Sequence, residues 1–266
     1  MKTFIVDLFH CNPDDLGQEA ATHDILGTSE SGVAFAQYYG HDYRLYSCED
    51  TDHELNVQDW HEQDKVSSRL RLKLIDINDF DGLPESLTQG QCKVRLILNG
   101  QGFIADSSEG SDAIAGLNSG EFIETLKNIL AKLNINKKNH QMVELIISAC
   151  TMARSTDFVN TLYGHFADYE NELKIILFKE VLSFDRRGQY CSFLDDGGYK
   201  AQSLEELTPD TALILQCGQS KENIFERKMP LNFKFKTLAP EPYFSETQQD
   251  IDTKRVALKT SLSVIN

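Results

Sequence analysis

Residues 93–102 read KVRLILNGQG and residues 142–150 read MVELIISAC, and these two stretches decide the fold. Each begins with an apolar run that predicts a buried strand and ends in small or polar residues. Between them, residues 119–133 carry apolar side chains at helical spacing, and Ser119 is the predicted N-cap. This order of strand, helix and strand predicts an α/β sheet with right-handed crossovers.

The same alternation extends outward on both sides. Apolar runs predict strands at 3–9 and 173–178, and helical spacing predicts a helix at about 157–168. Two apolar runs around a glycine-containing turn predict a β-hairpin over 181–193. Weaker patterns predict a short helix at 31–39, a strand at 43–47, a half-buried strand with one basic face at 69–77, and a strand or short helix at 212–217.

Length and composition set the domain organisation and exclude some functions. The chain has 266 residues, 41% of them hydrophobic and 25% charged, with a net charge of −15. We expect a single α/β domain over 1–239 and a polar, partly mobile tail over 240–266. The negative charge argues against non-specific nucleic-acid binding, because no basic field is present to replace phosphate counterions. No apolar run approaches the roughly 20 residues of a membrane span.

The cysteines and histidines argue against a structural metal site. The six cysteines lie far apart, without a CxxC pair, at Cys11, Cys48, Cys92, Cys150, Cys191 and Cys217. The N-terminus lacks the features of a signal peptide, so we expect reduced thiols and a cytoplasmic protein. His53 and His61 lie among acidic residues but lack an HExxH pairing, and no metal site is predicted.

Two predicted loops follow neighbouring parallel strands, and function collects at that edge of such sheets. They are Asn99–Gly102 and Ser148–Cys150. A cysteine directly after a buried strand can be a nucleophile, activated by nearby backbone amides. The alternative is that Cys150 is an inert residue of the core.

The four segments VRLILNGQG, AGLNSGEFIETLKNIL, VELIISACTMARST and EVLSFDRRGQYCSF, in that order, resemble clan CD cysteine peptidases, the caspase- and gingipain-like enzymes. The likeness is greatest to the self-processing cysteine protease domains of large bacterial toxins, and it covers roughly residues 93–195. It implies a caspase-like three-layer α/β/α sandwich in which the C-terminal β-hairpin is a flap. It also implies that Cys150 occupies the nucleophile position and that Gly102 is the loop glycine, which can contribute to an oxyanion hole.

The chain departs from this family at one catalytic position. Where the family has a catalytic histidine before the glycine, this sequence has Gln101, which cannot take a proton near neutral pH. His10 follows the first strand and would reach the edge of Cys150 if that strand neighbours residues 93–98. It is therefore a possible relocated base, although an ordinary loop residue is the alternative.

The resemblance also implies an anionic ligand, because the toxin domains bind inositol hexakisphosphate through lysines and arginines. Arg186, Arg187 and Lys200 are the candidates here, with Arg69, Arg71 and Lys73 as further basic residues. The alternative is that these are ordinary exposed charges.

Three hypotheses follow, in this order. The first is a degenerate peptidase homologue that binds a protein or peptide. By the same resemblance it is a candidate bacterial effector, secreted into a host cell without a classical signal peptide. The second is an active cysteine endopeptidase with Cys150 as nucleophile and a relocated base such as His10. The third is an unrelated α/β domain with Cys150 in its core.

Overall fold

The computed structural model describes residues 1–9, 28–48, 71–79, 83, 90–105, 112–135, 140–169, 172–180, 183–185, 187–193, 199–207 and 211–218. These residues belong to a compact unit that spans Met1–Glu222. The predicted domain boundary at residue 239 and the tail over 240–266 lie outside the described residues.

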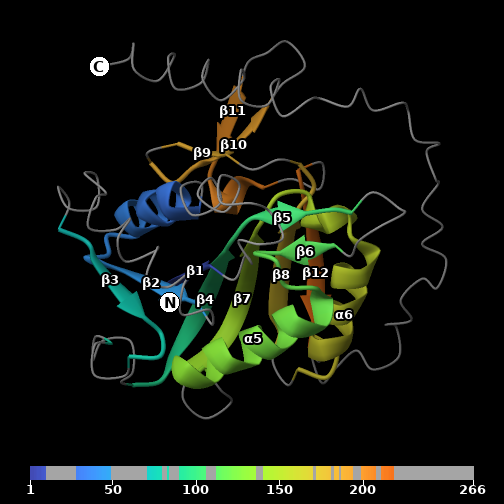
Figure 1. Ribbon diagram of the computed structural model, residues 1–266, viewed down its shortest axis with the longest axis horizontal. Coiled ribbons are helices and arrows are strands. Elements are labelled where there is room, and N and C mark those ends of the chain that lie inside the picture. The colour runs from blue at the N-terminus through green and yellow to red at the C-terminus, as the bar shows by residue number, and fades with distance from the viewer. Residues whose placement is uncertain are drawn as a thin grey trace. The chain divides into compact units, whose positions relative to one another are not determined.

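A seven-stranded sheet forms the centre of this unit (Figure 1), with the order β12-β8-β7-β4-β1-β2-β3. Its strands are β1 (Lys2–Leu8), β2 (Tyr43–Ser47), β3 (Lys73–Asp76), β4 (Cys92–Asn99), β7 (His140–Ser148), β8 (Leu173–Phe178) and β12 (Ala212–Cys217). Every neighbouring pair from β3 to β8 is parallel, and β12 is antiparallel to β8. The predicted mainly parallel α/β sheet is confirmed.

Most of the predicted strands are confirmed with small changes at their ends. Residues 212–217 form a strand rather than a short helix. The strand predicted at 69–77 is shorter than expected, because Arg71 has a φ of 56° and β3 begins only at Lys73. Such a positive φ is incompatible with extended backbone.

Helices α5 (Ser119–Lys132) and α6 (Thr156–Phe166) confirm the helices predicted at 119–133 and 157–168. The predicted N-cap of α5 is wrong: Asn118, not Ser119, accepts hydrogen bonds from the Gly120 and Glu121 amides at 3.0 and 3.1 Å. The Glu121 carboxylate accepts a hydrogen bond from the Asn118 amide in return. This reciprocal pair is a capping box, and its signature is an asparagine followed three residues later by a glutamate.

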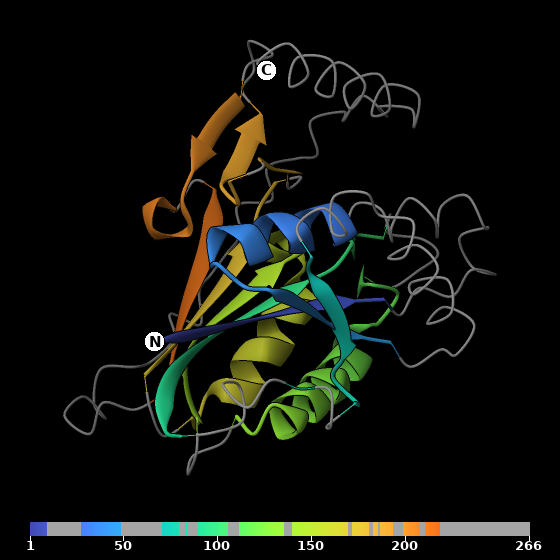
Figure 2. The ribbon, with the colours of Figure 1, turned by 90° about the vertical axis from the view of Figure 1, so that its left-hand side faces the viewer.

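A third helix, over residues 28–38, extends the short helix predicted at 31–39. Figure 2 shows this helix on one side of the sheet and α5 and α6 on the other. The unit is therefore the three-layer α/β/α sandwich that was expected.

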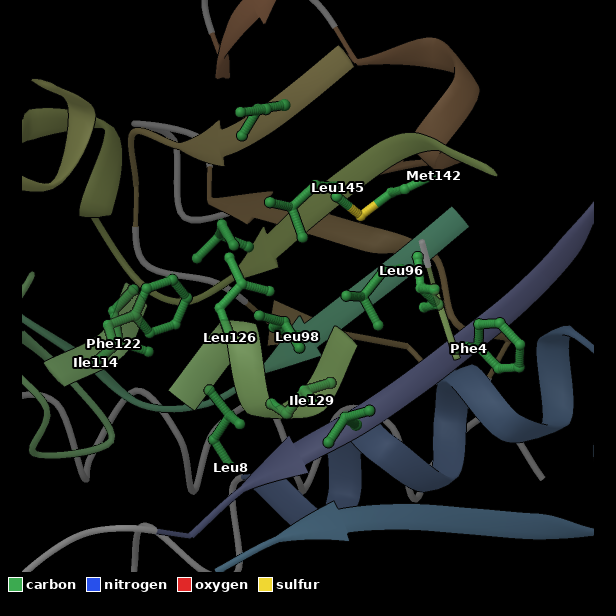
Figure 3. Close-up of a cluster of buried hydrophobic side chains, with 14 of the residues drawn as sticks. Phe4, Leu8, Leu96, Leu98, Ile114, Phe122, Leu126, Ile129, Met142 and Leu145 are labelled. Atoms are coloured by element: carbon green, nitrogen blue, oxygen red, sulfur yellow. The ribbon is translucent and has the colours of Figure 1, made fainter. Parts of the chain in front are cut away.

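The two faces of the sheet are apolar because alternate residues of each strand point to opposite sides. On the α5 and α6 side, Phe4, Leu96 and Leu145 lie in one buried cluster with Leu126 and Ile129 of α5 (Figure 3). On the other side, a second cluster joins central strand residues to the helix over 28–38 and to the residues that follow β8. Its buried members are Ile5, Phe35, Ile97, Ile146, Ile176, Phe178, Tyr190, Leu204 and Ala212.

The predicted hairpin is confirmed and belongs to a second sheet of three strands. Strands β9 (Ser183–Phe184) and β10 (Tyr190–Phe193) are antiparallel, and β11 (Tyr199–Gln202) pairs with β10 on its other side. The hairpin packs on the helix over 28–38: a Cβ atom at Gly188 would lie 2.6 Å from the Tyr38 Cβ atom. The tip of the hairpin is thus in contact with the body of the unit.

Candidate active site

The two predicted loops meet where β4 and β7 end. Asn99 and Ser148 are opposite one another in the parallel ladder, and the Gly100 amide donates a hydrogen bond to the Ser148 carbonyl at 3.1 Å. Beyond the ladder, Gly102 lies against the backbone of Cys150. A Cβ atom on Gly102 would be 2.3 Å from the Cys150 carbonyl oxygen and 2.8 Å from its amide nitrogen. The absence of a side chain at Gly102 therefore allows the two loops to touch.

Short strands β5 (Gly102–Phe103) and β6 (Ala113–Ile114) fix the conformation of the first loop. The Ala115 amide donates a hydrogen bond to the Gln101 carbonyl at 2.7 Å, and Gly102 faces Ile114 in the antiparallel ladder. In an antiparallel ladder, hydrogen-bonded and non-hydrogen-bonded residue pairs alternate. Because Gln101 is hydrogen-bonded to Ala115, Gly102 is at a non-hydrogen-bonded position, and its amide points away from β6. The Gly102 amide is then a donor that the ladder leaves available beside Cys150.

The second loop is held by Glu180, which follows β8. Thr151 has a φ of 59°, and its amide donates a hydrogen bond to the Glu180 carbonyl at 3.1 Å. Its hydroxyl donates to the Cys150 carbonyl at 2.7 Å, and Arg154, in the short 3-10 helix η1 (Met152–Arg154), pairs with the Glu180 carboxylate at 2.6 Å. Because Glu180 occupies the Thr151 amide, that amide is not a donor for a ligand at Cys150.

A buried polar network supports this edge of the sheet from the side of the helix over 28–38. Asp7 of β1 accepts hydrogen bonds from Arg44 of β2 at 3.0 Å and from the Asn99 side chain at 2.8 Å. Asn99 also donates to the Thr28 carbonyl at 2.8 Å, and Ser148 donates to Asn99 at 3.3 Å. Burial raises the pKa of Asp7 above its ordinary value, and Arg44 and Asn99 oppose that shift. The network ties the ends of β1, β4 and β7 together.

Tyr190 of β10 lies close to the Cys150 loop. Its ring packs on Phe178, with centroids 5.0 Å apart, and Phe178 comes two residues before Glu180, which holds the Thr151 amide. Burial raises the pKa of Tyr190 to about 12, and the negative charges of Glu180 and Cys150 add to the shift. The fully buried Tyr190 hydroxyl has no hydrogen-bond partner in the structure's described portion.

The sequence-predicted site residues come together in part. Gly102 and Cys150 are in contact, and Gln101 immediately precedes Gly102. Cys150 is half-buried rather than fully buried in the core. His10 lies outside the described residues.

Three histidines are described, and each lies away from the edge where Cys150 is found. His140 begins β7, at the opposite edge of the sheet. His41 precedes β2, where burial lowers its pKa, and His165 is near the end of α6, which returns to the amino edge. No described histidine is therefore a base for Cys150.

The predicted anionic site is described only in part. Arg187 is exposed at the hairpin turn and pairs with Asp185 at 3.2 Å. Arg186 and the side chain of Lys200 lie outside the described part of the structure, as do Arg69, His53 and His61. Among the residues that are described, no group of three or more histidine, cysteine or acidic side chains is arranged to hold a metal ion.

Sequence reasoning missed the supporting network and Tyr190. Asp7 carried a signal, as the one acidic residue in the apolar run over 3–9. Its partner Asn99 is 92 residues further along the chain, so no local pattern could connect the two. Tyr190 lay in a predicted hairpin, but its position beside Cys150 depends on how that hairpin packs.

No protein-family model matches the chain, and no curated protein matches it. The described helices include none that is long and apolar enough to cross a membrane. The mainly parallel seven-stranded sheet is compatible with a caspase-like fold.

Proposed function

We propose that the chain is a clan CD cysteine-peptidase-like protein that has lost catalysis and binds a peptide or protein ligand. The observation that carries the proposal is the contact between Gly102 and Cys150 at the ends of adjacent parallel strands. It is the juxtaposition that the resemblance implies for the loop glycine and the nucleophile. Gln101 then stands where the resemblance implies a catalytic histidine.

The chemistry of Gln101 argues against peptide hydrolysis. A neutral amide donates and accepts hydrogen bonds, but it takes no proton from a thiol and gives none to a leaving amine. The three described histidines are at other places in the fold. Gln101 therefore supplies no proton acceptor to the Cys150 thiol, and none of the described histidines lies at this edge of the sheet.

The groups around Cys150 suit a peptide ligand. The Gly102 amide is a hydrogen-bond donor that β6 does not use, and a peptide carbonyl oxygen is a suitable acceptor for it. Phe103, next to Gly102, is 57% exposed and offers an apolar contact for a ligand side chain. These features support binding through main-chain and apolar contacts, without a requirement for turnover.

An active endopeptidase is the second candidate, and the strand order favours it. β1 is adjacent to β4, with Asp7 opposite Asn99, so the chain leaves β1 at the edge where Cys150 lies. His10 follows two residues after the end of β1. A base relocated to His10 is therefore compatible with the topology. The third hypothesis, Cys150 as a core residue, gains no support from its half-buried position.

The resemblance extends the proposal in two further directions. One is secretion by a bacterium into a host cell, by analogy with the toxin domains. The other is an inositol phosphate ligand, for which Arg187 would have to leave its pair with Asp185.

Four proteins separate the first two candidates: the wild type, Gln101→His, His10→Ala and Cys150→Ala. Each is incubated with a peptide library at neutral pH, and cleavage is followed by mass spectrometry. The proposal predicts that the wild type cleaves no peptide. It also predicts that the wild type and Cys150→Ala bind the same peptides. Robust cleavage by the wild type that disappears in both His10→Ala and Cys150→Ala would establish the relocated base instead.

A further inference from the structure

A cysteine and a histidine form a close pair at the opposite edge of the sheet from Cys150. Cys92 begins β4 and His140 begins β7, and the two residues are partners in the parallel ladder. The Cys92 Sγ atom is 3.3 Å from the His140 Nδ1 atom, within hydrogen-bond reach. A thiol and an imidazole at this distance are the elements of an activated nucleophile.

The surroundings of the pair differ for its two members. His140 is fully buried, and its ring lies 5.9 Å from that of Phe4. Cys92 is half-buried at the margin of the core. Cys92 is thus the more exposed member of the pair, while the imidazole is enclosed by the core.

The other described cysteines lack this combination. Cys48, Cys191 and Cys217 are buried. Burial also raises the pKa of Cys191 to about 11, which suppresses its thiolate. Cys150 is half-buried like Cys92, but no described histidine lies at its edge. Among the described cysteines, partial exposure and a neighbouring imidazole coincide at Cys92.

We propose that Cys92 is a peroxide-reactive thiol for which His140 is the proton acceptor. The Cys92 sulfur attacks one oxygen of hydrogen peroxide, so that an S–O bond forms and the O–O bond breaks. His140 Nδ1 takes the thiol proton and passes it to the departing hydroxide, which leaves as water. The sulfur is oxidised by two electrons to a sulfenic acid, and the peroxide is reduced.

The test is site-resolved labelling of sulfenic acids in the full-length chain. The protein is exposed to dilute hydrogen peroxide with dimedone, and each cysteine is quantified by peptide mass spectrometry. We expect the labelling rate of Cys92 to be at least about tenfold higher than that of Cys150, because general base catalysis contributes at least that factor. Equal or faster labelling of Cys150 would overturn the proposal without any variant.

Variants then test the role of His140. His140→Asn keeps a polar side chain without a base, and it should lower the labelling of Cys92 about tenfold while the labelling of Cys150 stays constant. Circular dichroism verifies the fold, and His140→Gln replaces the first variant if that one unfolds. Cys92→Ser identifies the labelled site. Unchanged labelling of Cys92 in a folded His140 variant would refute the role of the imidazole.

Discussion

Replacement of Gly102 by alanine tests the contact on which the candidate site depends. The added Cβ atom would lie 2.3 Å from the Cys150 carbonyl oxygen and 2.8 Å from its amide nitrogen. Non-bonded atoms need about 3.5 Å, so the two loops must separate by about 1 Å. Both clashing atoms belong to the backbone, and Cys150 is followed by a loop that Glu180 holds in place. Rotation of a side chain cannot relieve the strain.

The expected cost of Gly102→Ala is that of overpacking, about 1–3 kcal/mol. With an m-value of about 2 kcal/mol/M, the midpoint of urea unfolding falls by about 0.5–1.5 M. The same variant should change the rate at which Cys150 reacts with iodoacetamide, because its loop is displaced. Both quantities are measured on the full-length protein.

Gly164→Ala is the matched control, because a Cβ atom at Gly164 in α6 meets nothing within 4 Å. An alanine in a helix is more favourable than a glycine by about 0.5–1 kcal/mol, so this variant should be more stable than the wild type. The reasoning is refuted if Gly102→Ala behaves like Gly164→Ala. That result would mean that the two loops are not in contact and that the site is not assembled as described.

Three further predictions concern the surroundings of the site and the pH dependence of stability. Tyr190→Phe removes a buried hydroxyl without a described partner, so chemical denaturation should show unchanged or slightly increased stability; a loss above about 1 kcal/mol would reveal a hidden hydrogen bond. Asn99→Ala leaves the buried Asp7 without one of its donors and should cost about 2–4 kcal/mol, clearly more than Ser148→Ala, which removes a single 3.3 Å hydrogen bond; equal losses would contradict the network. Burial lowers the pKa of His41 below 6.5, so the unfolded state binds a proton more readily and folding stability is lost as the pH falls through 6.5 towards the lower folded value. The difference in unfolding midpoint between pH 7.5 and pH 5.5 should therefore be smaller in His41→Phe, and an equal difference would assign the pH dependence elsewhere.

The long elements of the fold were predictable because their patterns are local. Strands β4 and β7 are continuous apolar runs, and α5 repeats apolar residues on one face. The rule that parallel strands end at one edge then predicted that the loops over 99–102 and 148–150 lie together. Two-residue strands such as β5 are too short to leave a pattern.

The rest of the site depends on tertiary packing. Asp7 and Asn99 meet because β1 is next to β4, and strand order is not encoded in either segment alone. The position of Tyr190 depends on the hairpin lying over the sheet, with Phe184 and Phe35 in contact at 4.5 Å between ring centroids. The pairing of Cys92 with His140 likewise follows from register, which no periodicity in either strand reveals.

The most direct test of the central claim is the reactivity of Cys150 itself. The second-order rate constant of its alkylation by iodoacetamide is measured at pH 7 by site-resolved mass spectrometry, in the folded protein and in the urea-unfolded chain. With Gln101 at the position where the resemblance implies a histidine, Cys150 in the folded wild type should react no faster than in the unfolded chain. Gln101→His should react about tenfold faster or more, because a neighbouring imidazole increases the thiolate fraction. A wild-type Cys150 that already reacts about tenfold faster than the unfolded chain, with no gain in Gln101→His, would contradict the claim that the site has lost its base.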